Sequence, residues 1–249
     1  MTGLPGMVTS GGHGVAPGAP VRVPVRAQLA ALVDRGVSWD AYHARIRRGR
    51  HPGRPAAVLV LFGVLDALPA HHSGGSVPAD LDVLLVGRAP TLTHHSGQIA
   101  FPGGRVDPGD SGPVAAALRE AVEETGLDAG GVDVLGTLGE LPVPVSNHLV
   151  TPVLAWWATP SPVDVVDVGE SATVFRASVA DLLDPEFRRT AILRRAGLVH
   201  RTPAFLVGTH VVWGFTAIVL TVLFDELGWT EPWDDARTIG VAGSGSRPR

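Results

Sequence analysis

Runs of apolar residues along the chain predict a series of buried strands. The segments 56–62 (AAVLVLF) and 81–86 (LDVLLV) are almost entirely apolar, which is typical of strands in the core of a sheet. We expect further strands at residues 132–136, 150–157, 172–175 and 209–213. We find no internal repeat and no second turn-rich linker, so one domain with frayed ends is the simplest organisation.

Apolar residues at helical spacing, together with start and stop signals, predict the helices. Leu29, Leu32 and Val33 share one face of a helix over residues 26–35. Ser38 can cap the start of a second helix over residues 39–48. We expect further helices at residues 113–125, 181–183, 186–195 and 215–227.

The two ends of the chain differ in composition from the rest. Residues 1–25 and 236–249 are rich in glycine, proline or serine, so we expect a disordered lead and tail. Between them we expect N-terminal helices at 26–53 and the main domain at 54–235. Residues 1–25 lack the basic-then-apolar order of a signal peptide, which predicts a cytoplasmic protein. The apolar stretch 205–224 has roughly the length of a membrane span, but it contains two glycines and a histidine. We interpret it as a short strand followed by a buried helix.

The composition excludes several kinds of chemistry. The chain has no cysteine, and all 20 of its basic residues are arginine. Disulfides, thiolate metal sites and cysteine nucleophiles are therefore excluded, as are lysine Schiff bases and the lysine of a P-loop. A net charge of -4 gives no basic footprint for nucleic acid, so we expect no nucleic-acid partner.

Three of the chain's eight glutamates, Glu120, Glu123 and Glu124, fall within five residues of one predicted helix. Asp110 or Ser111 can cap this helix, and the apolar stripe expected to face the core consists of Val114, Leu118, Ala121, Val122 and Thr125. Glu120 and Glu124 are one turn apart, where like charges repel, and acids near a helix C-terminus oppose its dipole. A solvated acidic face paired with arginines would explain the cluster, but a divalent cation would turn the repulsion into binding. Oxygen-only ligands favour Mg²⁺ or Mn²⁺.

The residues around the cluster resemble the Nudix box. That motif has a glycine, five residues, an acid, seven residues and then REUxEExGU, where U is aliphatic. Gly104, Asp110 and the segment 119–127 (REAVEETGL) follow this order. Two departures are that Asp110 stands where glutamate is usual, and that eight residues separate it from Arg119.

The extra residue is similar to the coenzyme A diphosphatase branch of the Nudix family, as is the upstream stretch GQIAFPGG at residues 97–104. The matching positions are Leu84, Leu85, Arg88, Ala89, Gly97, Phe101, Pro102, Gly103 and Gly104. Val86 replaces an expected threonine and Thr93 an expected arginine, which leaves the exact substrate open. The resemblance covers roughly residues 54–225.

The resemblance implies an α+β fold, a Nudix-type α/β/α sandwich with a mixed β-sheet and a loop–helix catalytic motif. It implies Mg²⁺ or Mn²⁺ bound by Glu120 and Glu124, with Glu123 as a further ligand or the general base. Arg119 would orient the glutamates, and the backbone at Gly103 and Gly104 would approach the substrate's phosphates. Outside the box, Arg88 could bind a phosphate or form a structural salt bridge, and Glu170 is either an additional acid or a surface residue.

The implied reaction is hydrolysis of a nucleoside diphosphate linked to another group, with coenzyme A or a derivative giving 4′-phosphopantetheine and 3′,5′-ADP. The expected partner is a small-molecule nucleotide, without nucleic acid or membrane, and the oligomeric state stays open. The alternatives are another Nudix substrate (ADP-ribose, a dinucleotide or an oxidised nucleotide), a non-catalytic Nudix-fold nucleotide-binding module and a membrane protein. The three intact glutamates argue against a pure binding module.

Overall fold

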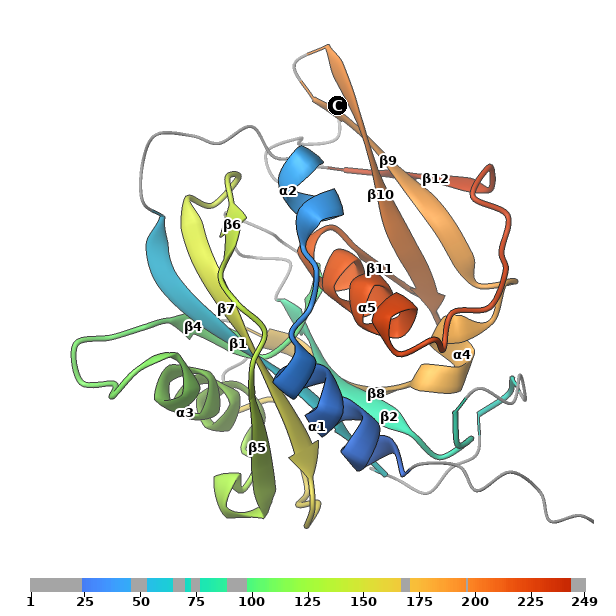
Figure 1. Cartoon of the computed structure of the whole chain (residues 1–249). Helices are drawn as coiled ribbons and strands as arrows, with labels where there is room; N and C mark the ends of the chain where they lie inside the picture. Colours follow the sequence, from blue (N-terminus) through green and yellow to red (C-terminus); the bar gives the residue numbers. More distant parts are fainter. Residues whose placement is uncertain are drawn as a thin grey trace, which may run out of the picture.

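A mixed eight-stranded sheet forms the centre of the fold in the computed structural model, which describes residues 24–45, 53–64, 70–72, 77–88, 98–166, 171–195 and 197–242 (Figure 1). The central strand β1 (Arg54–Gly63) pairs in parallel with β7 (His148–Trp157). The other strands of this sheet, all paired antiparallel, are β2 (Asp82–Arg88), β3 (Ile99–Ala100), β4 (Gly103–Arg105), β5 (Val132–Thr137), β6 (Leu141–Val143) and β8 (Ser171–Ser178).

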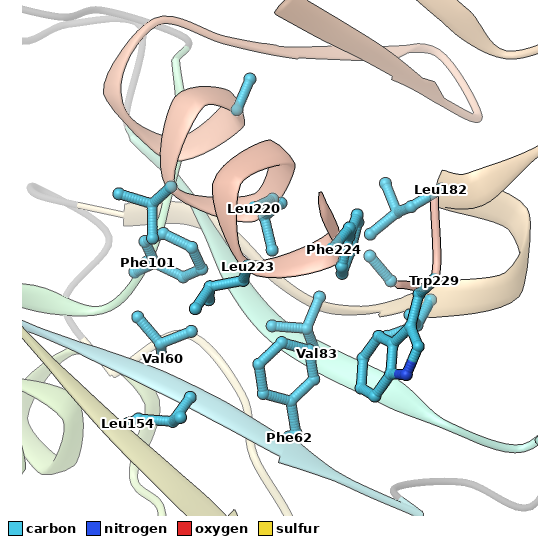
Figure 2. Close-up of a cluster of buried hydrophobic side chains, with 14 of the residues drawn as sticks. Val60, Phe62, Val83, Phe101, Leu154, Leu182, Leu220, Leu223, Phe224 and Trp229 are labelled. Carbon is cyan, nitrogen blue, oxygen red and sulfur yellow. The ribbon is translucent and has the colours of Figure 1, made fainter. Parts of the chain in front are cut away.

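The two faces of the sheet carry separate hydrophobic cores, because successive residues of a strand point to opposite sides. On β1, Leu59 and Leu61 lie in the core under α3 (Pro113–Thr125). Val60 and Phe62 lie in the opposite core, which also contains residues of α1 (Val25–Arg35) and α5 (Phe215–Glu226). Figure 2 shows Val60, Phe62 and Leu154 of the sheet beneath Leu220, Leu223 and Phe224 of α5. Helices on both faces of a mixed sheet confirm the predicted α/β/α sandwich.

A second, four-stranded sheet packs against α5 in the order β11-β10-β9-β12. Its strands are β9 (Arg188–Arg195), β10 (Leu198–Val207), β11 (His210–Trp213) and β12 (Thr238–Val241), and α4 (Val179–Leu183) precedes them. The remaining short elements are α2 (Asp40–Arg45) and the 3-10 helix Ala129–Gly131.

Two predictions for this region are wrong. The helix predicted at 186–195 is the strand β9, which pairs with β10 over its full length. The tail predicted to be disordered contains β12, which pairs in parallel with β9. In both cases pairing between strands overrides a weak local pattern, within a hairpin for β9 and β10 and with a distant segment for β12. Residues 1–23 and 243–249 lie outside the described residues, so disorder there stays a prediction.

The apolar stretch at 205–224 contains the end of β10, then β11 and most of α5, as the division into strand and helix predicted. Among the described residues, no helix has the length and apolar character needed to cross a membrane.

The short strand β4 connects the glycine-rich loop to the centre of the sheet. Gly103 pairs with Val58, and Gly104 pairs with Ala57. A Cβ atom on Gly103 would lie 2.3 Å from the carbonyl oxygen of Ala57, and Gly103 has a positive φ of 155°. Only glycine allows this approach without strain. The loop is therefore held against the central strand.

Candidate active site

Helix α3 begins without a side-chain cap. Its N-cap is Gly112, followed by Pro113 in the first turn, so neither Asp110 nor Ser111 caps it as predicted. Asp110 has other partners, since its carboxylate accepts from the backbone N–H of Asp107 and from a guanidinium. The helix ends as predicted at Gly126, whose φ of 68° is left-handed and whose N–H bonds to Val122.

The buried face of α3 consists largely of small residues. Ala116, Ala117 and Ala121 are fully buried against the sheet. Val122, predicted to face the core, is 39% exposed, whereas Glu124 is only 5% exposed. Of the predicted stripe, Ala121 and Thr125 are buried and Val114 and Leu118 pack against the same core, so only Val122 was misplaced. The correction places Glu124 at the edge of the buried face.

The glycine loop and two of the glutamates are in direct contact. The Oε2 atom of Glu124 accepts a hydrogen bond from the backbone N–H of Gly103 at 3.0 Å. The Glu120 carboxylate covers Gly104 so closely that a Cβ atom there would lie 2.3 Å from its carboxyl carbon. Four of the predicted site residues thus come together. One expectation changes, because the Gly103 N–H positions Glu124 and is not directed at a substrate.

Arg119 uses all five N–H donors of its guanidinium, two within its own helix and three towards the preceding loop. Nε and Nη2 donate to the two carboxylate oxygens of Asp110 at 3.1 and 3.0 Å. Nη1 donates to Glu120 at 3.1 Å and to Glu123 at 2.9 Å, and Nη2 also reaches the carbonyl oxygen of Arg105 at 3.0 Å. No donor is left over for a phosphate, which supports the predicted orienting role.

The ion pair between Arg119 and Asp110 changes the pKa values of both groups. Hydrogen bonding to Asp110 raises the pKa of Arg119 further above its usual value. The Arg119 guanidinium, followed by the backbone N–H of Asp107, lowers the pKa of the Asp110 carboxyl below 3.8. Both groups are therefore charged near neutral pH, and the eight-residue separation still allows them to meet.

The chemistry of the donor set fits a divalent cation. Five carboxylates lie in this region. Four of them pair with the guanidinium of Arg119, namely those of Asp107, Asp110, Glu120 and Glu123. The fifth, that of Glu124, accepts from the N–H of Gly103. Glu120 keeps only 17% of its side chain exposed, so its charge is poorly screened by solvent. Within the described ranges there is no group of three or more acids or histidines arranged to hold a metal. Magnesium fits such a site, because it often takes one or two carboxylates and completes its shell with water and phosphate oxygens.

The other predicted residues are less well placed or lie outside the description. Glu123 has 58% of its side chain exposed, and its described contact is the pair with Arg119. Arg88 ends β2, but its side chain is not among the described ones. Glu170 and Thr93 lie outside the described residues. Sequence reasoning missed Asp107, although the turn-forming order Asp-Pro-Gly-Asp at 107–110 was a signal for it.

Comparisons with known proteins identify relatives of this chain. A family model described as NUDIX domain matches residues 74–190, which include the loop and α3. The uncharacterized Nudix hydrolase NudL of Cronobacter sakazakii is 37% identical over 146 residues, which are 59% of this chain and 75% of that protein. NudL of Photorhabdus laumondii is 34% identical over 146 residues, covering 58% and 76% of the two chains.

Solved structures are also similar. The Nudix hydrolase RenU of M. smegmatis is 28% identical with a TM-score of 0.40, over 53% of this chain and 76% of RenU. The NUDIX domain of Shewanella oneidensis NrtR, crystallised with ADP ribose, is 19% identical with a TM-score of 0.40, over 59% and 86% of the two chains.

We predict that Gly104→Ala weakens divalent-cation binding about 10-fold or more, because its Cβ atom would displace the Glu120 carboxylate. Mn²⁺ titration followed by calorimetry measures the effect. The matched control is Gly109→Ala in the same loop, where an added Cβ atom meets nothing within 4 Å. Equal Mn²⁺ affinity in the two variants would remove Glu120 from the site.

The ion pair of Asp110 predicts a specific loss of stability in acid. Because the folded-state pKa lies below 3.8, the stabilisation is present above that pH and is lost as the pH falls through the folded pKa. The difference in unfolding free energy between wild type and Asp110→Asn should therefore shrink from about pH 6 to about pH 3, as measured by urea unfolding. In an Arg119→Gln background this pH dependence should become smaller, because only the backbone N–H of Asp107 then holds the carboxylate; an unchanged dependence would assign the effect to another group.

Proposed function

Since the chain belongs to the Nudix hydrolase family, we propose that it hydrolyses the diphosphate of coenzyme A or a derivative to 4′-phosphopantetheine and 3′,5′-ADP. It is a hydrolase by this membership, and the substrate is the proposed part. The observation that carries the proposal is the contact of Glu120 and Glu124 with the loop at Gly103 and Gly104. In that loop the stretch GQIAFPGG resembles the coenzyme A diphosphatase branch.

The spacing of the box adds support for this branch. The extra residue between Asp110 and Arg119 could have separated the acid from the arginine. Instead, Asp110 accepts two hydrogen bonds from the guanidinium. An aspartate, one methylene shorter than the usual glutamate, reaches the arginine from a loop that is one residue longer. The contact between the acid and Arg119 is therefore kept despite the two departures from the box.

Nudix hydrolases generally use divalent cations, and we propose Mg²⁺ or Mn²⁺ here, held by Glu120 and Glu124. When bound, the cation would neutralise non-bridging oxygens of the diphosphate and help to ionise the attacking water. Arg119 holds the Glu120 carboxylate in place, and Gly103 fixes the orientation of Glu124 through its N–H. Glu123 is either a further ligand or the general base.

Overall, hydrolysis breaks one P–O bond of the anhydride and adds water across it. The water oxygen joins one phosphorus atom, its proton passes to a base, and the other phosphate leaves with the bridging oxygen. A carboxylate beside the diphosphate is a suitable proton acceptor. Glu123 is accessible enough to exchange that proton with solvent, since 58% of its side chain is exposed. In our proposal Gly104 lies at the phosphates, and Arg88 contacts one of them.

The substrate assignment predicts the outcome of a panel assay. Purified protein with Mg²⁺ should convert coenzyme A to 4′-phosphopantetheine and 3′,5′-ADP, identified by mass spectrometry, and should turn over ADP-ribose, dinucleotides and oxidised nucleotides far more slowly. Turnover of ADP-ribose without coenzyme A would overturn the branch assignment and implicate Thr93, where the branch has arginine. No turnover of any member would favour a nucleotide-binding module.

We predict that Glu124→Gln lowers turnover about 100-fold or more while the protein stays folded, because the amide keeps a hydrogen-bond acceptor for Gly103 but loses the charge that binds the cation. Steady-state kinetics measures the turnover, and the melting temperature tests whether the variant stays folded. Glu140→Gln, at an exposed position outside the site, is the matched control. Near-normal activity of Glu124→Gln would remove it from the set of metal ligands.

A further inference from the structure

The hairpin of β9 and β10 extends beyond the rest of its sheet (Figure 1). Pairing of β12 with β9 ends at Leu193, and pairing of β11 with β10 starts at Ala204. The end of the hairpin therefore has no neighbouring strand among the described residues. It turns at Gly197, where an added Cβ atom would meet nothing within 4 Å. At about 3.3 Å per residue, the turn lies roughly 10 Å beyond Leu193.

The hairpin belongs to a long segment without acidic residues. Residues 187–224 contain no aspartate or glutamate, although the chain as a whole has a net charge of -4. Five arginines fall in this segment. Near the turn, Arg194, His200 and Arg201 are exposed. The end of the hairpin is therefore a cationic feature on a protein of opposite net charge.

The turn also carries exposed aliphatic residues. Leu198 is 63% exposed, the largest value among the large apolar residues of the described chain, and Val199 is 52% exposed. As consecutive strand residues they point to opposite faces of the hairpin. In the register, Val199 pairs with Arg194 and Leu198 pairs with Arg195. Each face therefore combines an aliphatic residue with an arginine position.

We propose that this hairpin end binds an anionic lipid surface by inserting its tip among the headgroups. Apolar residues next to cations suit the boundary between headgroups and acyl chains, where peripheral segments bury about 5–10 Å. Each arginine near an anionic leaflet adds attraction. The chain binds the surface without crossing the membrane, which revises the expectation of no membrane partner.

Two observations favour a lipid surface over a second copy of the chain. A protein interface would cover one face of the hairpin, whereas here each face carries an exposed aliphatic residue at the tip, which suits insertion end first. Two copies meeting through these hairpins would also bring together cationic segments that contain no acid, and like charges would repel. Anionic lipid matches the charge on every side of the tip.

The test is co-sedimentation of the full chain with vesicles. Vesicles of phosphatidylcholine with about one-third phosphatidylglycerol should bind about 10-fold more protein than pure phosphatidylcholine vesicles. Leu198→Asp combined with Val199→Asp should abolish binding, and Arg194→Ser combined with Arg201→Ser should remove the preference for anionic vesicles. Because these side chains are exposed, the melting temperature should not change.

Matched controls come from elsewhere on the surface. Val145→Asp changes another valine that is 59% exposed, and Arg54→Ser changes another exposed arginine; both should bind vesicles like wild type. Equal binding by wild type and the tip variants, or no binding to anionic vesicles, would overturn the proposal. A dimer in light scattering that the tip variants break, without vesicle binding, would assign the tip to a second copy. Binding to a single-stranded oligonucleotide instead of vesicles would assign it to nucleic acid.

Discussion

The candidate site depends on the hydrogen bonds that the guanidinium of Arg119 donates. The guanidinium joins two carboxylates of its own helix, the Asp110 carboxylate of the preceding loop and the carbonyl oxygen of Arg105. Lysine has three donors and no planar fork, so it could not make these contacts together. A chain whose basic residues are all arginine meets this requirement. These hydrogen bonds therefore join the loop and the helix into one structural unit.

This unit is positioned by small residues beneath it. The buried alanines of α3 let the helix lie close to the sheet, and β4 fixes the glycine loop to the central strand β1. Larger residues on that face of α3 would move the helix away from the sheet and separate Glu124 from the Gly103 N–H. The geometry of the carboxylates thus depends on what the sequence lacks, which is bulk on the inner face of α3.

The predictable and unpredictable parts of the structure differ in the range of their contacts. The Nudix-like box could be identified because its residues act within one loop and one helix, so spacing alone brings Arg119 to Glu123. The strands β1, β2 and β7 were found because they are nearly continuous apolar runs. By contrast, β9 is flanked by arginines and β12 has only four residues, so both depend on pairing with other strands, and the partner of β12 lies far along the chain. The sequence predicted Val122 on the buried face of α3, where the structure has Glu124. This difference depends on how the helix packs against the sheet, which a helical wheel does not show.

The three glutamates show how one residue type acquires different properties from its surroundings. Their repulsion and their opposition to the helix dipole should destabilise α3, and the structure compensates each in its own way. Glu123 is solvated and paired, Glu120 is paired and shielded from solvent, and Glu124 is buried with a backbone N–H at its carboxylate. Solvent and Arg119 balance Glu123, and the same guanidinium also binds Glu120 and Asp110. The carboxylates of Glu120 and Glu124 both lie where the glycine loop meets the helix, and carboxylate oxygens at such a point favour a divalent cation. This concentration of carboxylates supports our proposal of a metal between Glu120 and Glu124, independently of any likeness to other proteins.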